Sequence, residues 1–196
     1  MSSSDLVRWG ALGALLAGIM LIALGLIRLV ILGPVALYFG GAATAEDYLL
    51  DILFSIALVG MLVGIVGFRA RQAPHYGRLG TAGFLAAFVG VFFLLASTVA
   101  TILAGREVLD WLYILGFVGT LVGFVLLGAA TLRAGVLPRW CGVLIIVSVL
   151  GIPVYFGLGN YGGAILYGLV WLGLGYGLWL ERGMSGMSAE QDTRVR

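Results

Sequence analysis

Residues 9–32 read WGALGALLAGIMLIALGLIRLVIL, and Arg28 is the only charged residue in this stretch. A transmembrane helix needs roughly 20 mainly apolar residues, because each residue adds about 1.5 Å to the length of the helix. The stretch is long enough to cross a bilayer. We therefore predict that it forms the first transmembrane helix.

The same pattern continues along the chain. Only 10% of the residues are charged, whereas a soluble domain carries roughly 25%, and the mean hydropathy is +1.14. The sequence predicts an all-α polytopic membrane protein, a six-helix bundle that occupies residues 1–182 and precedes a disordered tail at 183–196. The further predicted spans are 49–68, 79–104, 109–132, 138–157 and 161–180.

The charges between these spans alternate in sign. Arginine collects in the loops around residues 69–78 and 133–139 and at both ends of the chain, whereas the loop around residues 46–51 is acidic. Cytoplasmic loops carry an excess of positively charged residues. This distribution predicts a multi-pass protein of the cell membrane with both termini in the cytoplasm.

Spans two and four match at an offset of 59 residues: LDILF at 50–54 corresponds to LDWLY at 109–113, and VGMLVG at 59–64 to VGTLVG at 118–123. Span six contains a fainter third copy, so we expect parallel repeats of a helical hairpin. A G-x-x-x-G spacing places both glycines on one helix face, where two helices can approach closely. These faces favour packing within the chain, with a homo-oligomer interface or a cofactor groove as the alternative; the glycines are Gly60, Gly64, Gly119, Gly123, Gly173 and Gly177.

Several classes of chemistry lack the residues they need. The chain has one cysteine, Cys141, one histidine, His75, and no lysine. A bis-histidine haem, a histidine-rich metal site, a Ser–His–Asp triad and Schiff-base catalysis are therefore excluded within this chain. No glycine-rich loop follows a strand as in nucleotide-binding proteins. We expect no metal, no cofactor and no nucleic-acid partner.

One mixed-charge group is predicted at the outer face. Asp51 and Asp110 are equivalent in the repeat, and carboxylates in a first helical turn are stabilised by the helix dipole. Thr44 and Asp47 have the spacing of an N-cap with an acidic third residue. Helix-end electrostatics is one interpretation; the other is an outer vestibule in which the two carboxylates face each other and bind a cation or donate a proton. The candidate residues are Arg28, Glu46, Asp47, Asp51, Arg106, Glu107 and Asp110.

Arg28 is the charge that lies deepest in a span. Its guanidinium can extend to the outer interface, or it can pair with Asp51 or Glu46. Pro153 interrupts span five, and we predict either a tolerated kink or a pocket lined by Tyr113, Pro153 and Tyr155. The hydroxyls of Ser97, Thr98 and Thr101 are expected to bond back to their own helix.

Membrane topology is the first explanation for the arginines in the predicted cytoplasmic loops, and binding of anionic lipid is the second. These arginines are Arg69, Arg71, Arg78, Arg133 and Arg139. No catalytic set is recognisable, so the leading hypothesis is a non-enzymatic binding or assembly component of the membrane. A transporter or channel for a small or lipophilic substrate is the first alternative. A lipid-active enzyme that uses an outer carboxylate is the second.

Overall fold

The computed structural model describes the backbone of residues 3–32, 44–72, 77–106, 108–157 and 163–194, and the side chains in these ranges except at 3, 31–32, 150–157 and 181–194. Every regular element in these ranges is a helix, so the predicted all-α polytopic bundle is confirmed. The elements are α1 (Ser3–Ile27), the π-helical segment η1 (Arg28–Leu32), α2 (Ala45–Gln72), α3 (Gly77–Ala104), α4 (Asp110–Ala134), α5 (Arg139–Gly157) and α6 (Gly163–Arg194).

Among the described residues, five helical segments are long and apolar enough to cross a membrane: Ser4–Val30, Ala45–Gln72, Gly77–Ala104, Asp110–Ala134 and Gly163–Leu180. With 28 residues, α2 extends beyond the predicted span 49–68 at both ends. At 1.5 Å per residue it is about 42 Å long, whereas the hydrocarbon core is about 30 Å thick. The helix is therefore long enough for its charged ends to extend past a hydrocarbon core.

The predicted span 138–157 corresponds to α5, which is helical over 19 residues. This length corresponds to about 28 Å, which matches a bilayer core. Within the described side chains, its apolar stretch is Arg139–Val149 and is shorter than a full span. A sixth span at α5 stays a prediction.

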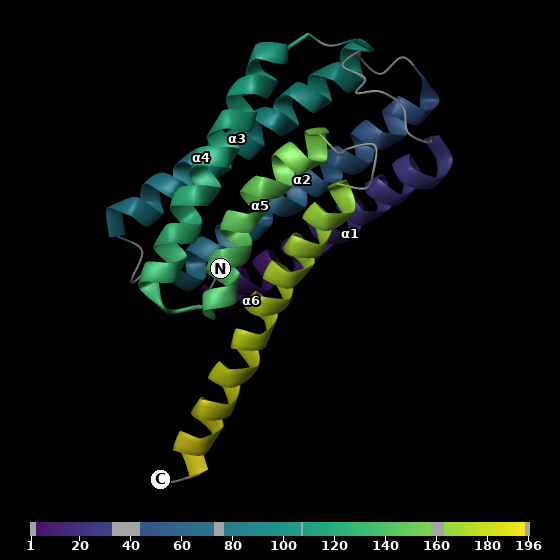
Figure 1. The fold of residues 1–196 in the computed structure, drawn as a ribbon. Coiled ribbons are helices and arrows are strands. Elements are labelled where there is room, and N and C mark those ends of the chain that lie inside the picture. The colour runs from purple at the N-terminus through teal and green to yellow at the C-terminus, as the bar shows by residue number, and fades with distance from the viewer. Residues whose placement is uncertain (1–2, 33–43, 73–76, 107, 158–162, 195–196) are drawn as a thin grey trace.

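The helices lie side by side, and the N- and C-terminal ends of the described chain lie at the same end of the molecule (Figure 1). The most extensive contacts join α3 to α4, α1 to α2 and α1 to α6. Consecutive helices thus form antiparallel hairpins, and α1 is packed between α2 and α6.

Glycines determine how closely the backbones of these helices approach each other. A Cβ atom added to Gly60 of α2 would lie 2.6 Å from the carbonyl oxygen of Gly13 in α1. On the other face of α1, a Cβ on Gly18 would lie 2.7 Å from the carbonyl oxygen of Gly168 in α6. Backbone atoms themselves are in contact, which is possible only where the side chain is a hydrogen atom. Such close approach is the main packing device of helices in lipid.

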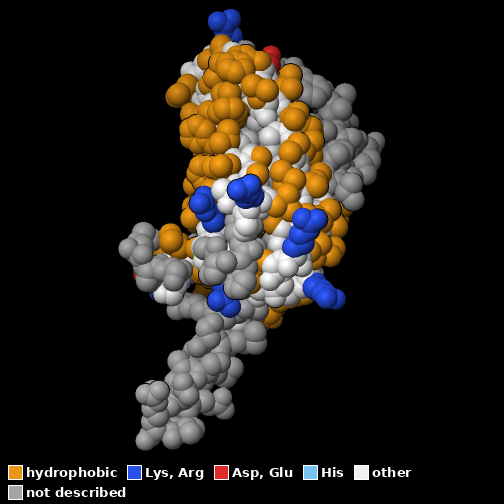
Figure 2. Space-filling view, turned by 90° about the vertical axis from the view of Figure 1, so that its left-hand side faces the viewer, with side chains coloured by type: hydrophobic (Ala, Val, Ile, Leu, Met, Phe, Trp, Pro, Cys, Tyr) orange, Lys and Arg blue, Asp and Glu red, His pale blue; other side chains and the backbone are white. Residues whose placement is uncertain are grey.

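The interior is filled by large side chains. Trp171, Phe68 and Phe124 are among the largest fully buried residues, and the rings of Phe124 and Trp171 are 5.8 Å apart at an angle of 56°. The outward faces are apolar as well: Leu103 is 82% exposed and Val30 is 74% exposed. Figure 2 shows an apolar surface along the length of the bundle. Apolar side chains on the surface are compatible with a bilayer as the surrounding solvent.

The final part of α6 extends past the end of the bundle and stays helical to Arg194 (Figure 1). This course differs from the disorder predicted for 183–196. Alanine, methionine, glutamate, glutamine and arginine in this segment have good intrinsic helix propensity, which accounts for a helical backbone there. Disorder of this tail in solution stays a prediction.

Candidate functional site

The two ends of the bundle differ in charge. At the acidic end, α2 and α4 begin, with Glu46 and Asp47 in the first turn of α2 and Asp110 in that of α4. At the arginine end, the same helices finish, with Arg69 and Arg71 in the last turn of α2 and Arg133 in that of α4. Most candidate residues predicted from the sequence lie at the acidic end.

Asp47 acts as part of a helix cap. Its Oδ2 accepts hydrogen bonds from the backbone N–H of Thr44 at 3.0 Å and from the Thr44 hydroxyl at 2.8 Å. The backbone N–H of Asp47 in turn donates to the Thr44 Oγ1 at 3.2 Å. This reciprocal arrangement satisfies donors that a helix start would otherwise leave free. The predicted cap is therefore confirmed, and it gives the Asp47 carboxylate a structural role.

The two repeat-equivalent aspartates have different surroundings. Asp110 is exposed in the first turn of α4, whereas Asp51 is half-buried. Because α2 begins at Ala45, four residues before the predicted start, Asp51 lies beyond the first turn. The helix-dipole argument made from the sequence was therefore wrong for Asp51, since the dipole effect falls off within the first turn. It holds for Asp110.

Arg28 lies where α1 changes into the π-helical segment η1. It is 19 residues beyond Trp9, which corresponds to about 28 Å along a helix. This distance is close to the thickness of a bilayer core, about 30 Å. Arg28 is half-buried, and its Nε has no hydrogen-bond partner among the described residues. π-Helical turns are often found at functional sites, so Arg28 keeps its place among the candidates.

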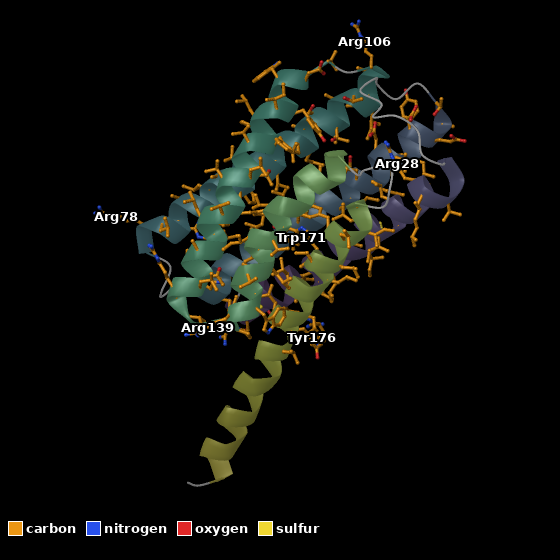
Figure 3. All side chains as sticks on the ribbon, in the orientation of Figure 1. Arg28, Arg78, Arg106, Arg139, Trp171 and Tyr176 are labelled. Carbon is orange, nitrogen blue, oxygen red and sulfur yellow. The ribbon has the colours of Figure 1, made fainter. Side chains whose placement is uncertain are left out.

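Two arginines of the candidate cluster lie apart from each other. Figure 3 shows the Arg106 side chain pointing away from the end of the bundle, with Arg28 at a separate place further along the molecule. Arg106 and Glu46 are both exposed. Glu107 lies outside the described residues. The vestibule in which Asp51 and Asp110 face each other stays a prediction.

The predicted pocket beside α5 is described only in part. Tyr113 is half-buried and packs against the hydrophobic core. Pro153 and Tyr155 lie in the part of α5 whose side chains are outside the described residues. The pocket stays a prediction.

The hydroxyls of α3 divide between two roles. Thr98 donates to the carbonyl oxygen of Leu94 at 2.9 Å, which confirms the expected bond within the helix. The expectation was wrong for Ser97, which donates instead to the carbonyl oxygen of Leu109 at 3.1 Å. That carbonyl immediately precedes α4, where Leu109 occupies the N-cap position without a side-chain cap. Ser97 thus ties the end of α3 to the start of α4.

A buried polar pair at the arginine end was not anticipated. The Gln72 amide donates to the Thr131 hydroxyl at 3.2 Å, and the hydroxyl also lies 2.9 Å from the carbonyl oxygen of Leu127. Gln72 is 0% exposed and Thr131 is 1% exposed. The two residues are 59 positions apart, which is the offset between spans two and four. The repeat offset makes the two positions equivalent, but no signal in the sequence showed that they are in contact.

Aromatic contact orders an arginine at this end. The guanidinium carbon of Arg69 lies 4.3 Å from the centroid of the Phe84 ring, within the range of a cation–π interaction. Phe84 in turn stacks on Phe88 at a centroid distance of 5.6 Å. Figure 2 shows arginine side chains gathered around one end of the apolar surface.

Within the described residues, no group of three or more His, Cys, Asp or Glu side chains is placed to hold a metal ion. Comparison of the chain with known protein families, with curated proteins and with solved structures gave no match.

Proposed function

We propose that this protein is a non-enzymatic integral component of the cell membrane that binds or assembles with other membrane molecules. One observation carries the proposal: buried side chains fill the middle of the bundle. Trp171, which Figure 3 places in the centre of the bundle, is 2% exposed and packs against Phe124 and Gly64. A bundle with such a centre offers its surfaces, and not its axis, to other molecules.

The bundle is proposed to consist of three copies of one helical hairpin. Gly64, Gly123 and Gly177 are equivalent in the sequence repeat of α2, α4 and α6. A Cβ on Gly64 would lie 3.3 Å from the Cβ of Ala14, one on Gly123 would contact Ala87, and one on Gly177 would lie 2.7 Å from the Sγ of Cys141. Each glycine therefore meets the preceding helix at a defined partner.

The first glycine of the motifs in α4 and α6 extends the same register. Gly119 faces Gly90 and Ala86, and Gly173 faces Leu144 and Trp140. From the second hairpin to the third, the contacting positions in both helices are offset by the same 54 residues: 119 corresponds to 173, 90 to 144 and 86 to 140. From the first hairpin to the second, the offset is 59 residues between α2 and α4 and 73 residues between α1 and α3. The two offsets differ because the connection within the first hairpin is longer. A shared register in three seams supports a repeated unit.

These contacts favour packing within the chain as the role of the glycine faces. A second copy of the protein that used Gly60, Gly64, Gly119, Gly123, Gly173 or Gly177 would have to displace α1, α3 or α5. Assembly with a partner is therefore proposed through the outward surfaces. The excess of arginine at the arginine end supports an orientation with that end, and both termini, in the cytoplasm.

Reconstituted vesicles separate this function from transport. We expect proton and monovalent-cation fluxes in proteoliposomes to equal those of protein-free vesicles, with an ionophore as the positive control. A protein-dependent flux that Asp51→Asn or Asp110→Asn abolishes, while Glu46→Gln retains it, would establish the transporter alternative instead.

Native mass spectrometry after mild extraction tests the binding role itself. We expect a defined mass above that of the chain alone, from a retained lipid or protein partner. Recovery of the bare chain under all extraction conditions would contradict the proposal.

A further inference from the structure

The arginine end carries positive charge without nearby acids in the sequence. The chain has no aspartate or glutamate between Asp51 and Glu107, and none between Asp110 and Glu181. The two loops at this end lie within these intervals and hold five arginines. Membrane topology alone explains why the charges in these loops are positive, but it does not explain how the arginines are placed relative to each other.

The fold brings the two loops together. The bond between Gln72 and Thr131 joins the last turn of α2 to the last turn of α4 across 59 residues of sequence. Arg133 follows Thr131 by two residues, and Arg69 precedes Gln72 by three. An unpaired polar side chain in an apolar interior is costly, so this buried pair holds the two helix ends in one arrangement.

Three of the arginines at this end are suited to an external anion. Arg69, Arg133 and Arg139 are exposed, and Figure 3 shows Arg139 at the end of the bundle opposite Arg106. The guanidinium of Arg69 is held over the Phe84 ring at 4.3 Å, which fixes its position without neutralising its charge. Arg71 is left out of this group because it already makes an interaction within the chain.

The surroundings of these side chains point to a lipid. Arginine side chains border one end of the apolar surface of the bundle (Figure 2), and Trp140, next to Arg139 in the sequence, is 39% exposed. Tryptophan is enriched where a membrane protein meets the headgroup region. Arginine donates paired hydrogen bonds to phosphate oxygens. A molecule that presents a phosphate at the headgroup level and acyl chains beside it matches both features.

We propose that Arg69, Arg133 and Arg139 form a binding surface for the phosphate headgroup of an anionic phospholipid at the arginine end of the bundle. Basic surfaces between transmembrane helices on the cytoplasmic side bind such headgroups. The surface does not depend on the proposed function: a transporter or an assembly component could equally retain a lipid here.

Lipid titration by native mass spectrometry tests this surface. The purified full chain in detergent is titrated with phosphatidylglycerol, with phosphatidylcholine and with inorganic phosphate. One basic group at an anionic surface contributes about 1 kcal/mol, which is about fivefold in affinity. We expect Arg69→Gln/Arg133→Gln/Arg139→Gln to bind phosphatidylglycerol about 100-fold more weakly, and phosphatidylcholine binding to stay unchanged.

Arg106→Gln is the matched control, because Arg106 is an exposed arginine at the opposite end. It should bind phosphatidylglycerol as the wild type does. Size-exclusion chromatography and circular dichroism verify folding; if the triple variant does not fold, Arg133→Gln and Arg139→Gln are measured singly, each with an expected loss of about fivefold.

Unchanged affinity in the variants, an equal loss in Arg106→Gln, or equal binding of both lipids by the wild type overturns the proposal. Binding of inorganic phosphate as strong as that of phosphatidylglycerol also overturns it, because the surface would then be a site for a soluble anion.

Discussion

The substitution Gly123→Ala is expected to force α3 and α4 apart. The new methyl group would lie 2.7 Å from the Cβ of Ala87 and would also meet the backbone of Ala87. Carbon atoms in ordinary contact are about 3.5–4.0 Å apart, so the seam must open by about 1 Å. A gap of that size forfeits a quarter to a half of each contact's attraction. Because backbone cannot rotate away, we expect a cost of about 2 kcal/mol, within the range of about 1–3 kcal/mol for overpacking.

Gly173→Ala is the matched control in the seam between α5 and α6. Its methyl group would meet the flexible end of Leu144 at 3.0 Å and Trp140 at 4.0 Å. A leucine side chain can move by a few tenths of an ångström at little cost. We therefore expect the stability of this variant to stay near that of the wild type, or to rise slightly because alanine has the higher helix propensity.

Thermal unfolding in one detergent at one scan rate compares the two variants. A cost of about 1 kcal/mol shifts the midpoint by about 2–4 °C in a chain of this size, so Gly123→Ala should melt about 4–8 °C lower. The reasoning is refuted if Gly123→Ala melts with the wild type, or if Gly173→Ala is destabilised as much.

Three further outcomes are expected. Thr131→Val should destabilise the protein by about 1–2 kcal/mol, because it removes the hydroxyl that pairs with the buried Gln72 amide. Gln72→Leu should cost less, because the Thr131 hydroxyl keeps its hydrogen bond to the carbonyl oxygen of Leu127. In a thermal-unfolding cycle the double variant should recover part of the summed loss; strict additivity would show that the two side chains are not coupled. Thr44→Ala removes the cap of α2 and should lower stability by about 1 kcal/mol, with hydrogen exchange increasing at the start of α2 and not at its end. In a cysteine-free background, Arg106→Cys should react with a membrane-impermeant maleimide added to intact cells and Arg78→Cys should not; the reverse labelling would contradict the proposed orientation.

The apolar runs of the sequence were sufficient to predict the helices, because the backbone of a span in lipid can satisfy its hydrogen bonds only within a helix or a closed barrel. The positions at which the helices begin and end were harder to predict. The start of α2 depends on the hydrogen bonds between Thr44 and Asp47, which recruit charged residues into the helix. A prediction from hydrophobic length alone therefore placed Asp51 too close to the helix start.

The placement of side chains between helices could be inferred only where the repeat supplied a register. The offset of 59 residues identified equivalent positions in α2 and α4, but it did not show that the equivalents Gln72 and Thr131 touch each other. Nor could the sequence show that Ser97 bonds to the segment before α4, because that bond depends on how α3 and α4 pack. The charged candidates were grouped by their positions between the spans, whereas their distances from each other depend on the tilt and length of each helix.

Disulfide cross-linking tests most directly whether one hairpin is repeated three times in one register. The three seams are tested with Ala14→Cys/Gly64→Cys and Ala87→Cys/Gly123→Cys in a Cys141→Ala background, and with Gly177→Cys beside the native Cys141. A disulfide needs Cβ atoms about 3.5–4.5 Å apart, and these positions are close enough to form one after small shifts.

Intact mass spectrometry should show an intramolecular disulfide in all three variants after mild oxidation, and none in Tyr176→Cys, whose side chain position is 56% exposed and adjacent to Gly177. Failure of any seam to cross-link in folded protein, or equal cross-linking of Tyr176→Cys to Cys141, would contradict the shared register.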